Sequence, residues 1–244
     1  MIRAFLQVLL FSLPVFANAT FDVGLQAYNQ EKWSDAIAQW ESIASSSQTS
    51  AELEYNLGNA YFRQGSIERS ILHYERALKL NPNDDDARKN LALANRGIVD
   101  QIAHAPKLGI WKYADSLRDS FSVSTSKALL FLFNTLLALS VGAMFYMNGN
   151  LRDAARRATI LFGCLSGLML LLYGWRCSAL SEASAVVMAE KTDIYSSPTD
   201  NSTQLFSLHS GTKVHVGETL SEWTEIQLSD GRKGWIPRAD IENI

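Results

Sequence analysis

The residue types that most often perform catalysis or bind metals are scattered along this chain. Its histidines are His73, His104, His209 and His215, and only the last two are near each other, six residues apart around an expected turn. A pair at that spacing lacks the further ligands that a zinc site needs, so surface positions are expected for both. The chain also lacks the G-x-S-x-G, H-E-x-x-H and phosphate-loop motifs. These patterns predict a protein that is not an enzyme, with no catalytic residue, metal or cofactor.

Two other candidates for chemistry fit simpler roles. The run Asp84–Asp86 lacks the additional oxygen ligands of a calcium loop, and it suits the first turn of a helix, where the helix dipole favours acidic residues. Cys164 and Cys177 would lie about 20 Å apart in one helix, which is too far for a disulfide. The chemistry that the sequence predicts is therefore binding.

The strongest local pattern fills residues 51–84. Apolar residues recur there at the period of two helices broken by a glycine, which predicts a helical hairpin. Small residues at Gly58 and Ala77 are expected where the helix axes approach, and the bulky Tyr61 and Tyr74 where the helices splay apart. A hairpin of this kind cannot bury its apolar face alone, so similar units are expected beside it.

Similar residue types do recur 34 residues before and after this hairpin. The earlier set is Val23, Gly24, Ala36, Trp40 and Ile43, which match Leu57, Gly58, Ser70, Tyr74 and Ala77. In the other direction, Leu91 and Ala92 match the start of the pattern, which then stops after one helix. We therefore expect two hairpins and a closing helix over residues 20–103.

The central hairpin resembles the tetratricopeptide repeat (TPR) family. It carries the L-G-x-x-Y motif, a small residue at Ser70, an aromatic residue at Tyr74 and an A-L-x-L-x-P ending. It departs from the family pattern at Glu54, where a tryptophan is common, and the first hairpin lacks the closing proline. The resemblance implies an α-helical TPR solenoid whose first helices line a concave groove for an extended peptide.

That resemblance places several polar side chains in the groove. The matching positions are Asn56, Asn59, Arg63, Lys89 and Asn90. Amide groups both donate and accept, which suits capture of a protein or peptide segment through its backbone. The alternative is that these residues are solvated positions on a helix face, because the array is short.

Composition points to a membrane protein. Only 19% of the residues are charged and the net charge is −3, which argues against a nucleic-acid partner. Dense apolar runs fill residues 128–147 and 158–175, and each is long enough to cover the roughly 30 Å hydrocarbon core of a bilayer. We expect these runs to form a two-helix transmembrane hairpin.

The connection between the two spans predicts their orientation. Residues 148–157 include Arg152, Arg156 and Arg157, and the positive-inside rule places such a loop in the cytoplasm. Both flanking domains would then lie in the periplasm, held at a bacterial inner membrane. Residues 1–19 have the early arginine, apolar run and Ala-Asn-Ala ending of a signal peptide, which predicts the same orientation, with an uncleaved anchor as the alternative.

Other features near the spans predict packing contacts. Residues 104–127 mix aromatic and basic side chains, as expected of a juxtamembrane segment at headgroup level or of a plain linker. Gly163, Gly167 and Gly174 share one face of the second span and are expected to pack against the first, with packing against a partner's helix as the alternative. Asn134 is interpreted either as a contact within a helix assembly or as a locally paired amide.

The period changes over residues 184–244, where short alternating runs between turn residues predict strands. Ser229-Asp230-Gly231 predicts a tight hairpin within them. The residues of the wider motif are Ser197, Pro198, Leu208, Gly211, Val214, Trp223, Ile226, Leu228, Asp230, Gly231, Gly234 and Trp235. On these residues the segment resembles the bacterial SH3-like domain family, which implies a small all-β SH3-like barrel.

Three aromatic residues of this segment are candidates for a ligand groove. They are Tyr195, Trp223 and Trp235. Tyr195 stands in a turn that often reads N-V-R in relatives, which is a departure from the family pattern. The two tryptophans are equally compatible with positions in the core, so both interpretations stay open.

The order of these parts resembles the BatE family of the Bat aerotolerance operons. That resemblance implies a membrane-held periplasmic adaptor in a stress-related envelope complex, with von Willebrand A-type membrane proteins among its partners. The function that the sequence predicts is a scaffold that binds a protein segment through its TPR groove. The alternative is a cell-wall receptor whose SH3-like domain binds peptidoglycan.

Overall fold

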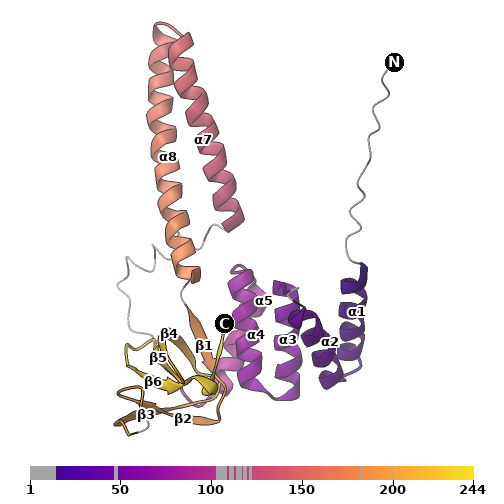
Figure 1. The fold of residues 1–244 in the computed structure, drawn as a ribbon. Coiled ribbons are helices and arrows are strands. Elements are labelled where there is room, and N and C mark those ends of the chain that lie inside the picture. The colour runs from indigo at the N-terminus through magenta and orange to yellow at the C-terminus, as the bar shows by residue number, and fades with distance from the viewer. Residues whose placement is uncertain are drawn as a thin grey trace, which may run out of the picture.

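The computed structural model describes residues 15–46, 49–102, 123–181, 183–199 and 201–244, with Gly109, Tyr113, Leu117 and Ser120 between them. Figure 1 shows three parts, which are a stack of short helices, a long two-helix hairpin and a small β-sheet. The sheet lies beside the helical stack, although the hairpin separates them in the sequence. The predicted multidomain fold class is confirmed. Residues 1–14 of the predicted signal peptide and most of the predicted juxtamembrane segment lie outside the described residues.

The helical stack consists of two hairpins and a closing helix. Its elements are α1 (Val15–Asn29), α2 (Trp33–Ser45), α3 (Ala51–Gln64), α4 (Ile67–Leu80), α5 (Asp85–Ala94) and the short 3-10 helix η1 (Asn95–Gly97). Ser50 begins α3 by accepting a hydrogen bond from the backbone N–H of Leu53, and Gly65 ends it in the left-handed conformation. Asp84 caps α5 in the same way, so the acidic run belongs to a helix start as the sequence predicts.

Two equivalent glycines show why the repeat has its period. A Cβ atom at Gly58 would lie 2.6 Å from the ring of Tyr74, and one at Gly24 would overlap the ring of Trp40, 2.7 Å from its Cδ1. Each hairpin therefore buries a large aromatic residue of its second helix against a glycine of its first. The expectation that Tyr74 lies where the helices splay apart is wrong, because its ring fills the point of closest approach.

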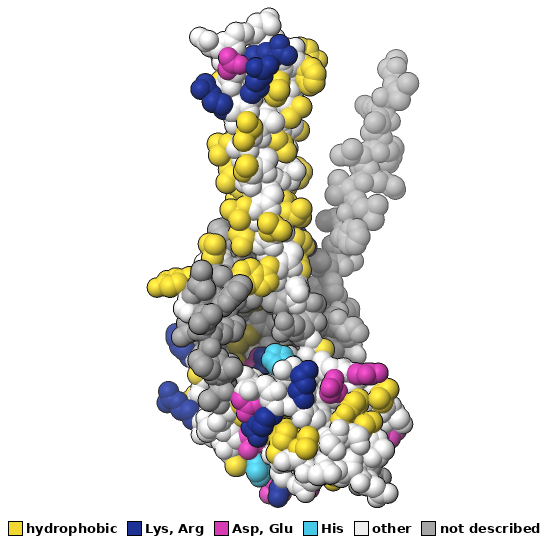
Figure 2. All heavy atoms as spheres, turned by 90° about the vertical axis from the view of Figure 1, so that its left-hand side faces the viewer, with side chains coloured by type: hydrophobic (Ala, Val, Ile, Leu, Met, Phe, Trp, Pro, Cys, Tyr) yellow, Lys and Arg dark blue, Asp and Glu magenta, His cyan; other side chains and the backbone are white. Residues whose placement is uncertain are grey.

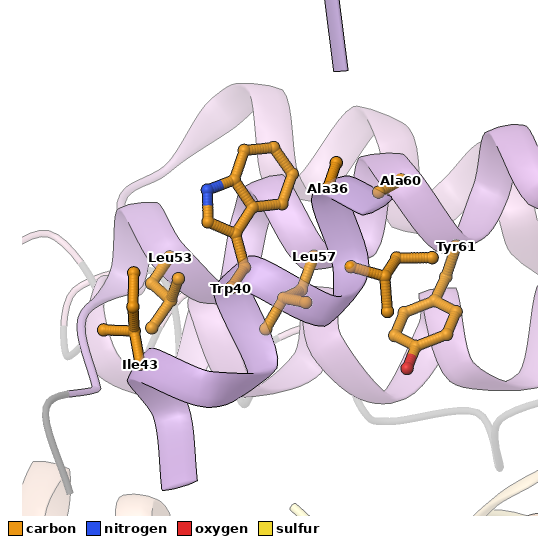
Figure 3. Packing of buried hydrophobic residues seen from close by; sticks show 8 residues of the cluster. Ala36, Trp40, Ile43, Leu53, Leu57, Ala60 and Tyr61 are labelled. Carbon is orange, nitrogen blue, oxygen red and sulfur yellow. The ribbon is translucent and has the colours of Figure 1, made fainter. Parts of the chain in front are cut away.

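The interior between the two hairpins is apolar and closely packed. Figure 3 shows Trp40 above Leu57 and Ala36 beside Ala60, and all four side chains are fully buried. A polar pair lies in the same interior, where His73 contacts the carboxylate of Glu54 at 2.7 Å. Burial alone would raise the pKa of Glu54, but hydrogen bonds from His73 and Thr49 outweigh it and lower the pKa. Glu54 is thus accommodated in the interior by the contacts of its carboxylate with His73 and Thr49.

The long hairpin consists of α7 (Val123–Tyr146) and α8 (Asn150–Ser181). Both helices are long and apolar enough to cross a membrane, and only 6% of the residues in each apolar window are buried. A core helix of a soluble protein would be mostly buried, so this hairpin is not one. The connection between the two helices is shorter than the ten residues predicted, because α8 begins at Asn150. Its first turns therefore carry Arg152, Arg156 and Arg157.

The two long helices meet through a few specific contacts. The Thr159 hydroxyl donates to Ser140 Oγ at 3.0 Å, and a Cβ at Gly163 would lie 3.9 Å from Leu137. The predicted contacts of Gly167 and Gly174 with α7 are wrong, because a Cβ at either position would have no described atom within 4 Å. The two helices are therefore in close contact at Gly163 and farther apart at the other two glycines of the same face, for which a partner's helix stays a prediction.

The C-terminal part is a seven-stranded antiparallel sheet with the order β3-β2-β6-β5-β4-β1-β7. Its strands are β1 (Ser184–Val187), β2 (Lys191–Tyr195), β3 (Gln204–His209), β4 (Lys213–Leu220), β5 (Trp223–Gln227), β6 (Lys233–Pro237) and β7 (Ile241–Asn243), with the 3-10 helix η2 (Arg238–Asp240) between the last two. Alternate residues face one core, which includes Ile194, Ile226 and Ile236. The predicted turn joins β5 to β6, where Gly231 has a positive φ of 94°.

The helical stack and the sheet share a hydrophobic cluster, which the sequence patterns did not predict. Ile71 of α4 and Val186 of β1 are both fully buried in it, next to Tyr74. Polar contacts border the cluster, with Lys213 Nζ 2.7 Å from Glu75 and Arg76 Nη2 3.0 Å from Glu242. Helix α4 therefore packs on α3 and on the sheet at the same time.

Asp100 makes the most concentrated polar contact of this interface. Its carboxylate accepts from the backbone N–H of His209 at 2.6 Å and from the Thr212 hydroxyl at 2.9 Å, and it lies 3.1 Å from Nδ1 of His209. Burial alone would raise its pKa, but these hydrogen bonds lower the pKa of Asp100 instead. The end of the helical stack is thereby fixed to the turn between β3 and β4.

The glycine contact predicts a stability change. Replacing Gly58 with Ala should lower the free energy of unfolding by about 1–3 kcal/mol, because the new Cβ overlaps the Tyr74 ring, even though alanine is the better helix former. The measurement is denaturant unfolding of the full-length protein in detergent. Gly97→Ala is the matched control, since its Cβ would lie 3.8 Å from Ile67, an ordinary contact. Equal stability of the two variants would contradict this packing.

The Asp100 contact predicts a pH-dependent stability change. Because its folded-state pKa is lowered, its contribution is fully present above the unfolded value of about 3.9 and is lost as the pH falls through the folded value. Asp100→Asn should therefore cost about 1–3 kcal/mol at pH 7 and progressively less below about pH 4. Urea unfolding between pH 7 and pH 3 measures this, with the exposed Asp22→Asn as control. If the loss of stability caused by Asp100→Asn stays the same from pH 7 to pH 3, the Asp100 contact is not the source of that loss.

Candidate peptide groove and aromatic face

A groove of about 370 Å³ opens on the helical stack between α1, α3, α4 and α5. We call it the TPR groove, and its lining residues are Tyr28, Tyr55, Asn59, Phe62, Arg63, Tyr74, Asn90 and Leu93. Aromatic and apolar side chains form most of its wall, and no acidic residue lines it. Its polar groups are two asparagines, three tyrosines and one arginine, which is a surface suited to binding rather than to catalysis.

Hydrogen bonds hold the two asparagines in place. The Tyr74 hydroxyl donates to Asn59 Oδ1 at 2.7 Å, and Asn90 Nδ2 donates to the same oxygen at 2.9 Å and to the Tyr55 hydroxyl at 3.3 Å. Within the described part of the chain, these bonds leave Asn59 Nδ2 and Asn90 Oδ1 without a partner. The groove therefore presents one fixed amide donor and one fixed amide acceptor.

Tyr74 is suited to its role as a donor. Burial, together with the nearby Tyr55, raises the pKa of the Tyr74 hydroxyl well above its usual value. The hydroxyl therefore stays protonated at neutral pH and remains available as a donor to Asn59 Oδ1.

Arg63 gives the TPR groove its charge. It lies in the last turn of α3, its side chain is exposed, and no described carboxylate forms an ion pair with it. A guanidinium group at the edge of a groove without acidic residues attracts a carboxylate. The groove is therefore electrostatically suited to an acidic segment.

The structure brings together only part of the predicted peptide-binding set. Asn59, Arg63 and Asn90 line the groove, but Asn56 and Lys89 do not. The Asn56 amide donates to the backbone oxygen of Glu52 at 2.9 Å, and Lys89 lies 3.4 Å from Asp86 on the exposed side of α5. These two side chains are thus bonded within their own helices.

The aromatic wall of the groove was missed, although the sequence contained its signal. Tyr55, Asn59 and Phe62 are three and four residues apart, so they share one face of α3. Tyr28 is 34 residues before Phe62, which is the repeat period found for the core residues. Applying the same period to the surface residues would have found this wall.

The three aromatic candidates of the sheet do lie together. Tyr195 of β2 and Trp223 of β5 have ring centroids 5.3 Å apart in an edge-to-face arrangement, and Trp235 of β6 pairs directly with Tyr195. All three side chains are half-buried, and none belongs to the core cluster, which takes the alternate residues of the same strands. We call this surface the aromatic face. It also carries Glu225, which pairs with Trp235 across the two strands.

The described histidines do not form a site, and His104 lies outside the described residues. His209 contacts Asp100 in the domain interface, and His73 contacts Glu54 in the helical interior. Among the described residues, no three histidine, cysteine or acidic side chains are grouped closely enough to hold a metal ion.

Comparison with known families agrees with the two patterns described above. Residues 51–84 match the tetratricopeptide repeat model, and residues 190–242 match the bacterial SH3 domain model. A search of curated proteins found no match. TPR units mediate protein–protein interactions, so a protein partner is the binding class that this match indicates.

Proposed function

We propose that this protein is a membrane-anchored adaptor that binds an extended protein segment in the TPR groove. The observation that carries the proposal is the pair of hydrogen-bonded asparagines, which present a donor and an acceptor beside Arg63, an arginine that forms no ion pair with a described carboxylate. An extended peptide exposes alternating carbonyl and N–H groups along its backbone, which matches that pair. The bound segment would therefore be selected mainly by backbone shape.

Each group of the groove has a distinct part in this binding. Asn59 Nδ2 donates to a carbonyl of the segment, and Asn90 Oδ1 accepts from one of its N–H groups. Arg63 pairs with a carboxylate of the segment, and Tyr28, Phe62 and Leu93 contact its apolar side chains. Because Tyr55 and Tyr74 already hold the asparagines, little side-chain entropy is lost on binding. Asn56 and Lys89 belong to the predicted set but do not line the groove. They would contact the segment only where it extends past the groove.

The proposed location is a bacterial inner membrane, with both folded domains in the periplasm. The contact between Ile71 of α4 and Val186 of β1 supports a common compartment, because a chain that crosses a membrane twice returns to the side it left. Figure 2 shows basic side chains gathered at the far end of the hairpin, where α8 begins, and apolar side chains along its length. The positive-inside rule assigns such an end to the cytoplasm.

The partners that we propose are other envelope proteins. The order of TPR units, a two-span hairpin and an SH3-like domain favours a stress-related complex of the Bat type, with von Willebrand A-type membrane proteins as candidate partners. No enzymatic activity is proposed, because the groove and the aromatic face contain no nucleophile paired with a base.

A second candidate function rests on the aromatic face. Tyr195, Trp223 and Trp235 form a half-buried aromatic surface beside Glu225, and sugar rings and peptide stems both bind such surfaces. The protein would then be a receptor for peptidoglycan, with the helical stack transmitting the binding. This function differs from the first in its ligand and in the domain that binds it.

The groove predicts a charge-dependent loss of partner. Arg63→Glu should lower the recovery of the bound protein at least tenfold, because it places an acidic group beside the acidic segment. The measurement is affinity capture of the tagged full-length protein from solubilised membranes, followed by quantitative mass spectrometry. Arg96→Glu is the matched control, since Arg96 is exposed on η1 outside the groove. Equal recovery with both variants would place the contact elsewhere.

The aromatic face predicts the outcome for the receptor function. The full-length protein in detergent should sediment with purified sacculi, and Trp235→Ala should reduce the bound fraction several-fold if the aromatic face binds peptidoglycan. Leu205→Ala is the control, because Leu205 is half exposed on the same sheet but outside the three aromatic residues. Sedimentation that does not depend on Trp235 would reject the receptor function.

A further inference from the structure

An amide in α7 faces outward in the apolar part of the hairpin. Asn134 is exposed and lies seven residues after Lys127, which is about 10 Å along the helix into the apolar run. Its Nδ2 donates to the backbone oxygen of Leu130 at 2.8 Å, and within the described residues this is its only hydrogen bond. Its carbonyl oxygen and its second N–H are therefore left facing lipid, where a polar group without a partner is unfavourable.

A neighbouring polar residue shows that this situation is particular to Asn134. Thr135 is also exposed, but its hydroxyl donates its one proton to the backbone oxygen of Phe131 at 2.9 Å. A hydroxyl bonded in this way is commonly tolerated in a membrane helix. An amide bonded through one of its two N–H groups still has a donor and an acceptor to satisfy.

Asn134 lies on a defined stripe of α7. The stripe consists of exposed residues spaced three and four apart, Phe131, Asn134, Ala138, Val141 and Phe145. It lies to one side of the contact with α8, about 100° around the helix from Leu137 and Ser140, through which α7 contacts α8. Residues at this spacing form the contact surface, or seam, through which two helices pair. A single asparagine in such a seam fixes the register of the two helices relative to each other. Ala138, one turn from Asn134, allows the two helix axes to approach closely.

We propose that this stripe binds α7 of a second copy of the chain, with the two Asn134 amides hydrogen-bonded to each other. An amide with one unused donor and one unused acceptor is complementary to itself across a two-fold axis. Two copies inserted in the same direction also place Asn134 at the same depth. A helix of another protein would need a matching polar group at that depth, so the second copy is the favoured occupant.

The inference rests on the membrane placement in the proposed function. Cysteine cross-linking in native membranes tests it, with the full-length protein carrying Cys164→Ser and Cys177→Ser. Ala138→Cys should give a disulfide-linked dimer on oxidation, because this position lies in the seam. Leu132→Cys, which is also exposed but lies on the opposite side of α7, should give at least tenfold less. Equal cross-linking at the two positions would overturn the proposal.

A second variant tests the role of the amide itself. Asn134→Leu in the Ala138→Cys background should reduce the dimer at least threefold, whereas Thr135→Val should leave it unchanged. The Asn134→Leu helix is more apolar, so weaker insertion cannot explain the loss. Alkaline extraction of the same membranes reports insertion. Inserted Ala138→Cys protein that gives no dimer, or an undiminished dimer with Asn134→Leu, would overturn this inference alone, whereas extractable Ala138→Cys protein would overturn the membrane anchor of the proposed function.

Discussion

The packing of α4 between two partners is the constraint on which the rest of the structure depends. On one side Tyr74 fills the space over Gly58 and orients Asn59 in the groove, and on the other Ile71 is fully buried against Val186 of the sheet. One helix therefore supports both the binding surface and the contact between the two domains. Because the hairpin lies between these domains in the sequence, this contact also requires the chain to leave and return on one side of any membrane that the hairpin crosses.

Features with a local origin could be predicted from the sequence. The repeat period, the hairpin of long apolar helices and the strand pattern each arise from residues close together in the chain, and all three agree with the structure. The contact of Asp100 with His209 and Thr212 had no such signal, because it joins residues more than 100 positions apart. Polar contacts between domains depend on the final orientation of both surfaces, which a residue pattern does not specify.

The predicted site residues also divide into two groups, those that the repeat geometry places in the groove and those whose side chains bond within their own helix. Asn59 and Arg63 of α3 and Asn90 of α5 reach the groove because the repeat geometry orients them, whereas Asn56 bonds to its own helix backbone one turn back. The glycines of α8 divide for a different reason. Gly163, Gly167 and Gly174 lie within about 40° of one another around the helix, but only a Cβ at Gly163 would come within 4 Å of a described atom of α7. The sequence predicted the shared face of these glycines, and it did not predict how far along that face the two helices stay in contact.

The packed arrangement has a consequence for weak binding. A short TPR array buries little of a peptide, so the groove alone is expected to bind with modest affinity. The aromatic face lies on the domain that packs against α4, so a partner that contacts both surfaces binds the second one at high effective concentration. Restriction of the protein to a membrane plane, and pairing of two copies through Asn134, would each raise that concentration further. A scaffold built in this way needs several modest contacts rather than one strong site, which agrees with a groove that presents only two hydrogen-bonded amides and one exposed arginine.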